Sequence, residues 1–197
     1  MARTNRPAAR AFLVPALAYA AQVHAHQLRE GAGTPYIAHP MAVCAVVLEA
    51  GGDEDQAIAA LLHDTAEDHG GRKRLEDIRQ RFGERVAAIV EGCTDSLDRP
   101  KPPWRVRKER HLGHLAQASD DVLLVALADK LHNARSVLID YRQHGEAVWS
   151  RFAAGRDYAS WYLVELARLF RDRRPGPLAD ELGRLVRETI ALMASNG

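Results

Sequence analysis

Four ionisable side chains stand close together in residues 61–68, whose sequence is Leu-Leu-His-Asp-Thr-Ala-Glu-Asp. They are His63, Asp64, Glu67 and Asp68. They follow an apolar run, residues 57–62, that is typical of a buried helix face. If the helix continues through them, His63 and Asp64 can bind one ion, and Glu67 and Asp68 lie one turn further on. Because carboxylates are rarely buried without a partner or a metal, the stretch indicates a cation site; the alternative is a helix that ends in solvated acids.

A second apolar stretch carries another acid. Residues 121–139 have a strongly apolar helix pattern into which Asp129 intrudes. One cation shared between the two stretches explains both acids, whereas separate buried salt bridges need two accounts. His39 precedes Pro40 at the expected start of a third helix, because proline is tolerated in the first helical turn. The candidate metal ligands are therefore His39, His63, Asp64 and Asp129.

The types of ligand restrict the metal and its chemistry. Two nitrogens and two oxygens, with positions left for water, suit Mn²⁺, Fe²⁺ or Zn²⁺ better than Ca²⁺ or Mg²⁺. Water bound to such an ion is acidified toward neutrality and becomes a nucleophile. Glu67 and Asp68 are not needed as ligands, and they stand where a carboxylate can orient that water or accept its proton. The combination predicts a hydrolase.

A cluster of cations indicates where an anionic ligand could bind. It follows the irregular, proline-rich residues 91–104 and consists of Arg105, Arg107, Lys108 and Arg110. Cations near a helix N-terminus oppose the helix dipole, so the cluster has no obvious structural benefit. Backbone N–H groups and basic side chains together make a phosphate site. A solvated basic face explains any single one of them equally well.

Helices account for most of the remaining chain, so we expect an all-α fold. They are expected over residues 11–29, 39–48, 54–68, 75–82, 86–90, 121–139, 149–152, 158–170 and 178–193, with another beginning at 105. Asp53 is the expected N-cap of the helix that carries the acidic cluster. Residues 72–74 are interpreted as a solvated basic turn. Trp161, Leu163, Leu166 and Leu169 are assigned to packing.

Length and charge favour one soluble domain. The chain has 197 residues, and we expect a single domain over 1–197, with the motif-bearing core at about 12–141 and C-terminal packing helices at about 145–194. Its 27 Lys and Arg against 26 Asp and Glu give a net charge of +1, so no bulk field attracts nucleic acid or a membrane. Any anionic ligand must therefore be held by local groups.

The cysteines and the N-terminal residues indicate the cellular compartment of the protein. Cys44 and Cys93 stand beside apolar residues, as small buried side chains do in a reducing compartment, so we expect a cytoplasmic protein. Three arginines before the apolar residues 11–21 imitate a secretory signal. The helical pattern continues past the supposed cleavage point, which argues against that alternative.

Several separated motifs, taken in order, resemble one family, the HD-type hydrolase domain of the RelA/SpoT alarmone enzymes. The motifs are His24-x-x-Gln27-x-Arg29, Thr34-Pro35-Tyr36-Ile37-x-His39-Pro40, Leu61-Leu62-His63-Asp64-x-x-Glu67-Asp68, Thr94-Asp95 and Leu127-Ala128-Asp129-Lys130-Leu131-His132-Asn133-x-Arg135. The likeness covers roughly residues 12–141. We expect the small hydrolase-only members to be most similar, because the chain ends about where a synthetase domain would begin.

The resemblance implies an all-helical enzyme, usually with Mn²⁺, that removes the 3′-pyrophosphate of guanosine tetra- and pentaphosphate (ppGpp and pppGpp) to give GDP or GTP. The residues that match its metal ligands are His39, His63, Asp64 and Asp129. Glu67 and Asp68 match the acidic pair beside the attacking water. The residues that match positions near the nucleoside are Arg29, Asn133 and Ser136, and Lys108 matches a basic residue near the phosphates. His132 matches no ligand position and is expected to pack beside the site.

One departure from the family leaves the base of the substrate undetermined. Glu30 stands where many members have a lysine, so adenosine alarmones such as ppApp remain an alternative to ppGpp. A nucleotidase of the HD type would keep the metal ligands but would not need Glu67 and Asp68 or the Arg29 loop. A non-catalytic alarmone sensor would bind without turnover. The sequence gives neither the oligomeric state nor the role of residues 100–104.

Overall fold

A computed structural model describes residues 12–29, 33–97, 100–151 and 155–195 of the chain. Within these ranges the backbone forms α-helices and one 3₁₀ helix, and the only extended pairing is an isolated bridge between Leu28 and Pro35. The expected all-α fold is confirmed. No helix in these ranges is both long enough and apolar enough to span a membrane.

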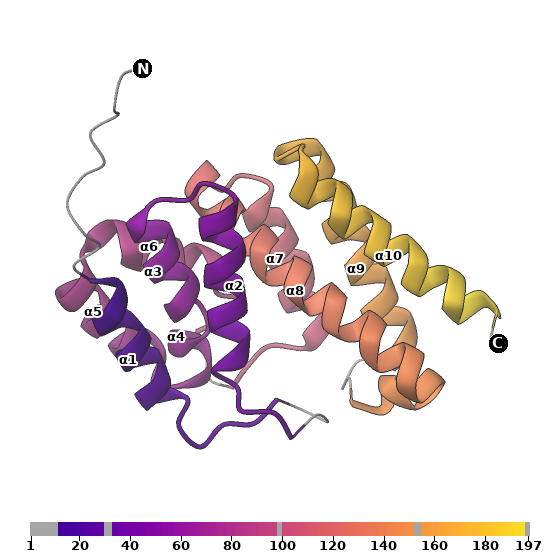
Figure 1. The fold of residues 1–197 in the computed structure, drawn as a ribbon, viewed down its shortest axis with the longest axis horizontal. Coiled ribbons are helices and arrows are strands. Elements are labelled where there is room, and N and C mark those ends of the chain that lie inside the picture. Colours follow the sequence, from indigo (N-terminus) through magenta and orange to yellow (C-terminus); the bar gives the residue numbers. More distant parts are fainter. Residues whose placement is uncertain (1–11, 30–32, 98–99, 152–154, 196–197) are drawn as a thin grey trace.

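Short helices make up the N-terminal part of the fold (Figure 1). In order they are α1 (Leu13–Val23), α2 (Ala38–Glu49), α3 (Glu54–Leu62), α4 (Thr65–Asp68), α5 (Gly71–Phe82) and α6 (Glu84–Cys93). α3 packs against α1, α2 and α6, and its residues 57–62 are each at most 2 % exposed. Burial on all sides explains why this stretch is a continuous apolar run.

The start of α3 is fixed by a reciprocal cap. The Asp53 side chain accepts a hydrogen bond from the Gln56 backbone N–H at 3.0 Å, and the Gln56 side chain accepts one from the Asp53 N–H at 2.9 Å. This is the capping box, and it confirms Asp53 as the N-cap. The helix therefore begins at a defined residue, and His63 follows its last residue.

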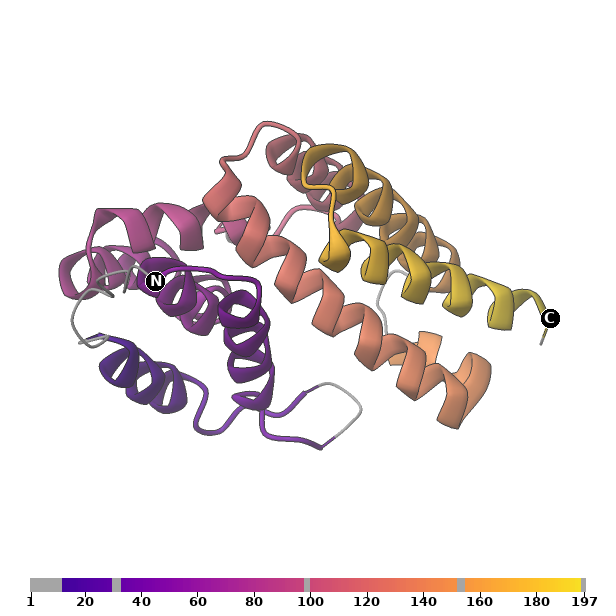
Figure 2. The same cartoon turned by 45° about the horizontal axis from the view of Figure 1, so that its top comes forward.

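A long helix, α8 (Asp120–His144), connects the two halves of the molecule. In both views it runs between the N-terminal helices and the last two helices (Figures 1 and 2). The remaining elements are α7 (Trp104–Leu115), the 3₁₀ helix η1 (Gly145–Arg151), α9 (Gly155–Arg173) and α10 (Pro177–Ser195). α8 contacts α2, α3 and α6 as well as α9 and α10. A side chain on α8 can therefore meet residues from either half.

Gly92 allows α6 to approach α8 closely. A Cβ atom at this position would lie 2.5 Å from Cγ2 of Val122, closer than real Cβ contacts. Val122 is itself 7 % exposed, so it has little room to move aside. A larger residue at 92 would force α6 away from the helix that carries Asp129.

Two helices, α1 and α3, end well before the residues predicted from the sequence. α1 ends at Val23 and does not continue to Arg29, because backbone bonds from Arg29 N to Thr34 O and from Tyr36 N to Gln27 O replace helical ones. Leu28, which lies beyond the end of α1, is 59 % exposed. α3 ends at Leu62, and His63 and Asp64 form a turn before α4.

Two smaller expectations are also settled within the described ranges. Residues 72–74 lie in the first turns of α5, so the interpretation as a solvated turn was wrong. The predicted separation of the helices over 75–82 and 86–90 is confirmed, since Gly83 separates α5 from α6 with a positive φ of 93° that glycine adopts readily. Glu30 lies outside the described residues.

Candidate metal centre

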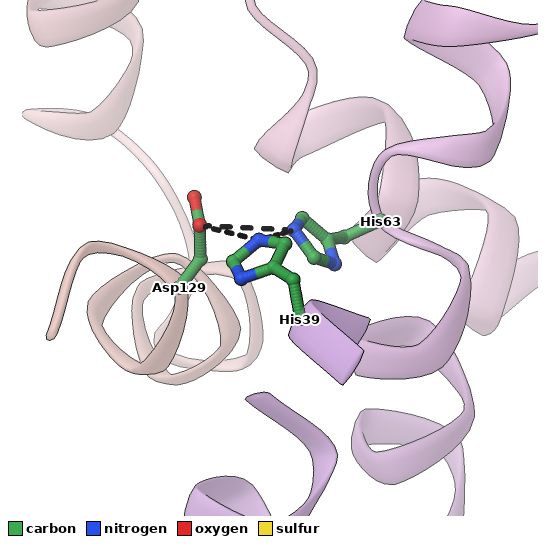
Figure 3. A group of neighbouring side chains, drawn as sticks. All are labelled: His39, His63 and Asp129. Atoms are coloured by element: carbon green, nitrogen blue, oxygen red, sulfur yellow. Dashed lines mark hydrogen bonds and ion pairs between the residues drawn. The ribbon is translucent and has the colours of Figure 1, made fainter. Parts of the chain in front are cut away.

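Two imidazoles and two carboxylates converge where α2, the α3–α4 turn and α8 meet. His39 lies in the first turn of α2, His63 and Asp64 form the turn, and Asp129 lies within α8. His39, His63 and Asp129 are between 2 % and 6 % exposed. Figure 3 shows the Asp129 carboxylate facing both imidazoles. The turn that replaces the predicted helix lets neighbouring residues His63 and Asp64 face the same point.

The distances between these groups fit a single ion. His39 Nε2 lies 3.2 Å from both His63 Nε2 and Asp129 Oδ1, and His63 Nε2 lies 3.7 Å from Asp129 Oδ1. Asp64 Oδ2 lies 2.9 Å from His63 Nε2 and 3.4 Å from His39 Nε2. Ligand atoms about 2.1 Å from one ion lie roughly 3 to 3.5 Å apart in octahedral or tetrahedral geometry. His39, His63 and Asp129 are therefore placed to hold a divalent cation, and the Asp64 carboxylate lies beside the two imidazoles.

Neighbouring groups orient both imidazoles for ligation. His63 Nδ1 lies 2.8 Å from the Ala60 carbonyl, which can only accept, so Nδ1 carries the proton. His132 Nδ1 lies 3.2 Å from the Arg29 guanidinium, which can only donate, so His132 accepts there. His39 Nδ1, 2.8 Å from that same His132 atom, must therefore be its donor. Each ligand histidine is left with its Nε2 lone pair facing the cluster, as metal ligation requires.

The carboxylates are held by separate partners. Tyr36 donates its hydroxyl hydrogen to Asp64 Oδ2 at 2.6 Å. Asn133 donates to Asp129 Oδ1 at 2.6 Å, and Lys130 donates to Asp129 Oδ2 at 2.6 Å. These contacts fix the orientation of both acids before any ion binds. Tyr36 and Lys130 were quoted as parts of motifs but were given no role in the sequence analysis.

Charge is concentrated at this point. Burial disfavours a charged imidazole, but the Asp64 and Asp129 carboxylates outweigh it and raise the pKa of His63 well above its usual value. Burial likewise disfavours an ionised Asp129, yet Lys130 and the two histidines lower its pKa well below the usual range. Without an ion, protons and Lys130 balance the acids.

The acidic pair is split between two environments. Asp68 accepts a hydrogen bond from Gln27 Nε2 at 2.8 Å, and burial together with the Asp64 charge raises its pKa. Glu67 accepts from the Asp95 backbone N–H at 3.0 Å and from Lys101 Nζ at 2.8 Å. Lys101 belongs to the proline-rich residues 100–104, which places part of that segment beside the acidic pair.

Gln27 is held in one orientation. Its Oε1 lies 2.6 Å from His24 Nδ1 and 2.8 Å from His69 Nε2. Because the Nε2 group must donate to the Asp68 carboxylate, Oε1 accepts from both imidazoles. The motif residues His24 and Gln27 therefore position Asp68.

A cavity of about 690 Å³ is lined by residues of α9 and by three side chains that contact the cluster, Tyr36, Lys130 and Asn133. Its lining includes Asp68 and all the residues expected near the substrate, namely Arg29, Lys108, Asn133 and Ser136. Arg29 donates to Asn133 Oδ1 at 3.1 Å, and Ser136 donates to the His132 carbonyl at 3.0 Å. Lys108 pairs with Asp95 at 2.8 Å, while burial and the nearby Lys130 lower its pKa.

Two other members of the basic cluster, Arg105 and Arg107, have structural partners. Arg107 pairs with Asp95, and Arg105 pairs with Glu109 at 2.6 Å while its guanidinium lies 3.4 Å from the centre of the Trp161 ring. Of the four cations, Lys108 is the one that lines the large cavity. Leu163 and Leu166, assigned to packing, line the same cavity, so that assignment was incomplete.

The described chain is all-helical, and two imidazoles and two carboxylates meet at its centre. Comparisons with known proteins show the family to which the chain belongs. The HD domain family matches residues 16–158. A Xenopus tropicalis protein named guanosine-3′,5′-bis(diphosphate) 3′-pyrophosphohydrolase MESH1 is 40 % identical over 130 residues, which is 64 % of this chain and 70 % of that one. An Aquifex aeolicus protein named guanosine-3′,5′-bis(diphosphate) 3′-pyrophosphohydrolase is 40 % identical over 122 residues, 61 % of this chain and 17 % of that one.

A solved structure extends the likeness to three dimensions. It is described as a metazoan orthologue of SpoT that hydrolyses ppGpp, and it is 28 % identical, with a TM-score of 0.60 over 88 % of this chain and 100 % of that one. The chain belongs to the HD domain family, and its relatives include proteins named as 3′-pyrophosphohydrolases.

Metal binding should release protons and strengthen as the pH rises. In the metal-free protein the Asp64 and Asp129 carboxylates raise the pKa of His63 despite its burial and so favour the protonated ring, whereas ligation requires the neutral ring. Below that pKa, each ion that binds must displace a proton. Calorimetric titration of metal-stripped protein with Mn²⁺, at pH values from about 6 to about 8 and in buffers of different ionisation enthalpy, measures both effects. An affinity independent of pH, without proton release, would contradict ligation by His63.

Proposed function

We propose that the protein is a metal-dependent hydrolase that removes the 3′-pyrophosphate from ppGpp and pppGpp, giving GDP or GTP and pyrophosphate. One observation carries the proposal. Asp68 lines a cavity together with Tyr36, Lys130 and Asn133, three side chains that contact the ligand cluster. The same cavity is lined by cations suited to phosphates, Arg29, Lys108 and Lys130. The names of the relatives favour the same reaction.

In this proposal His39, His63, Asp64 and Asp129 hold Mn²⁺, with Fe²⁺ or Zn²⁺ as alternatives. The mixed nitrogen and oxygen set supports a borderline ion. When bound, such an ion lowers the pKa of water and stabilises charge on a phosphoryl oxygen. Lys130 keeps Asp129 ionised and oriented for this role.

Asp68 is the better placed proton acceptor of the acidic pair. It lines the cavity, and its raised pKa lies closer to neutrality, as general acid–base catalysis favours. Glu67 accepts hydrogen bonds from Lys101 and from the Asp95 N–H, which hold its carboxylate in one position, and we assign it the role of orienting the reacting groups. Both residues remain catalytic candidates.

The substrate would be a free nucleotide held along one face of α8. Asn133 and Ser136 follow Asp129 by one and two helical turns, so together with Arg29 they are placed to contact the nucleoside. Lys108 would contact phosphates. A net charge of +1 supports neither a nucleic acid nor a membrane as the partner. We further propose that residues 1–197 act as one domain in the cytoplasm.

The test is a substrate panel. Mn²⁺-loaded protein is incubated separately with ppGpp, ppApp and a nucleoside 5′-monophosphate, and the products are separated by ion-exchange chromatography. We expect GDP and pyrophosphate from ppGpp. Faster turnover of ppApp would transfer the proposal to adenosine alarmones. Release of phosphate from the 5′-monophosphate alone would indicate a nucleotidase, and binding without turnover a sensor.

Replacing either acid by its amide should separate catalysis from metal binding. Asp68→Asn and Glu67→Gln keep shape but remove the charge and proton-accepting ability, so turnover should fall about a hundred- to ten-thousand-fold. Metal content should stay at the wild-type value, because neither side chain is proposed as a ligand. Bound Mn²⁺ and pyrophosphate release are measured on the same samples. Glu76→Gln, on the exposed face of α5, is the control and should change neither.

If both amide variants turn over at the wild-type rate, the catalytic role is wrong while the metal site stands. If the variants lose the metal, Glu67 and Asp68 are metal ligands, and the proposed separation of ligands from catalytic residues is wrong.

A further inference from the structure

Helix α9 contributes an unexplained polar group to the cavity. Tyr162 lines it from beyond residue 158, where the match to the HD domain family ends. The side chain is 8 % exposed, and among the described residues its hydroxyl oxygen has no hydrogen-bond partner. Buried hydroxyl groups are almost always paired, so an unpaired one that lines a cavity points to a missing ligand.

The Tyr162 ring is fixed by aromatic neighbours. The Trp104 ring meets it edge-on with centroids 5.8 Å apart, and the Trp161 ring lies at 6.2 Å. Trp104 also lines the cavity. Because the hydroxyl lies in the plane of a ring held in this way, it cannot turn away to find another partner.

Two ammonium groups share this end of the cavity. Lys108 Nζ lies 5.0 Å from the centre of the Tyr162 ring, and both Lys108 and Lys130 line the cavity. Lys130 is the nearby charge that acts most strongly on the Tyr162 hydroxyl, and burial is the main reason that the pKa of this hydroxyl is raised. The hydroxyl therefore keeps its proton and can donate.

The missing ligand must accept hydrogen bonds. An ammonium group can only donate hydrogen bonds. A protonated tyrosine hydroxyl near two ammonium groups can donate a third hydrogen bond to the same acceptor group. The carboxylates that pair with these lysines, Asp95 and Asp129, belong to the protein and leave the hydroxyl unpaired. A phosphoryl group supplies several anionic acceptor oxygens, which fits three donors that line the same cavity.

We propose that the Tyr162 hydroxyl, with Lys108 and Lys130, binds a phosphoryl oxygen of the 3′-pyrophosphate of the substrate. Lys130 contacts the metal ligand Asp129, so this group of donors lies beside the reaction centre and not at the nucleoside end. The inference rests on the proposed function for the identity of the substrate. It makes α9 a part of the substrate site and not only a packing helix.

The test replaces Tyr162 by phenylalanine, which removes the hydroxyl and keeps the ring. The affinity of Mn²⁺-loaded protein for inorganic pyrophosphate, measured by calorimetry at equal metal content, should fall about tenfold or more, as expected for a lost hydrogen bond to a charged group. The melting temperature of the free protein should stay the same or rise, because an unpaired buried hydroxyl is removed. Tyr158→Phe, at an exposed ring beside Trp104, should change neither value.

Stability and binding together decide the outcome. Unchanged pyrophosphate affinity in Tyr162→Phe, or no pyrophosphate binding by the wild type, overturns the proposal. A lower melting temperature with equal losses of GDP and pyrophosphate affinity also overturns it, because the hydroxyl would then be structural. If the wild type fails to hydrolyse ppGpp but binds pyrophosphate in a way that depends on Tyr162, the subsite stands and the proposed reaction fails.

Discussion

Two carboxylates and two imidazoles meet at a point that is almost closed to solvent, and their mutual electrostatics govern the rest of the structure. Asp129 is 6 % exposed, so its charge needs a permanent counter-charge. Protons and Lys130 supply that charge without an ion, and a divalent cation supplies more of it at shorter range. The side chains of the cluster come from segments far apart in the sequence. The packing of these segments against one another therefore depends on how the charge at this point is balanced.

One face of α8 carries a residue of the metal cluster and residues that line the cavity. Asp129 belongs to the metal cluster, Asn133 touches that carboxylate and Arg29, and Ser136 lines the cavity one turn further on. Lys130 points its ammonium at the same carboxylate while lining the cavity. A shift of α8 by a fraction of a helical turn would move the ligand and the substrate contacts together. Close contacts such as Gly92 against Val122 oppose that shift.

The sequence predicted the side chains that meet better than the backbone that brings them together. Asp129 was recognisable because it interrupts an apolar helix pattern, and His39 because it precedes a proline at the expected start of a helix. The turn at His63 was not, since the hydroxyl that holds Asp64 there comes from Tyr36, a residue of another segment. Tyr162 was hidden for a similar reason, because only tertiary packing shows that one tyrosine on an amphipathic helix lacks a partner in the described structure.

The central claim is that one divalent ion binds where these helices meet. Anomalous diffraction from crystals of the protein grown with Mn²⁺ tests it most directly, because the signal locates the ion without assuming its ligands. The account predicts one strong peak about 2.0 to 2.3 Å from Nε2 of His39, Nε2 of His63 and a carboxylate oxygen of each of Asp64 and Asp129. A peak elsewhere, or none within reach of Asp129, would contradict it.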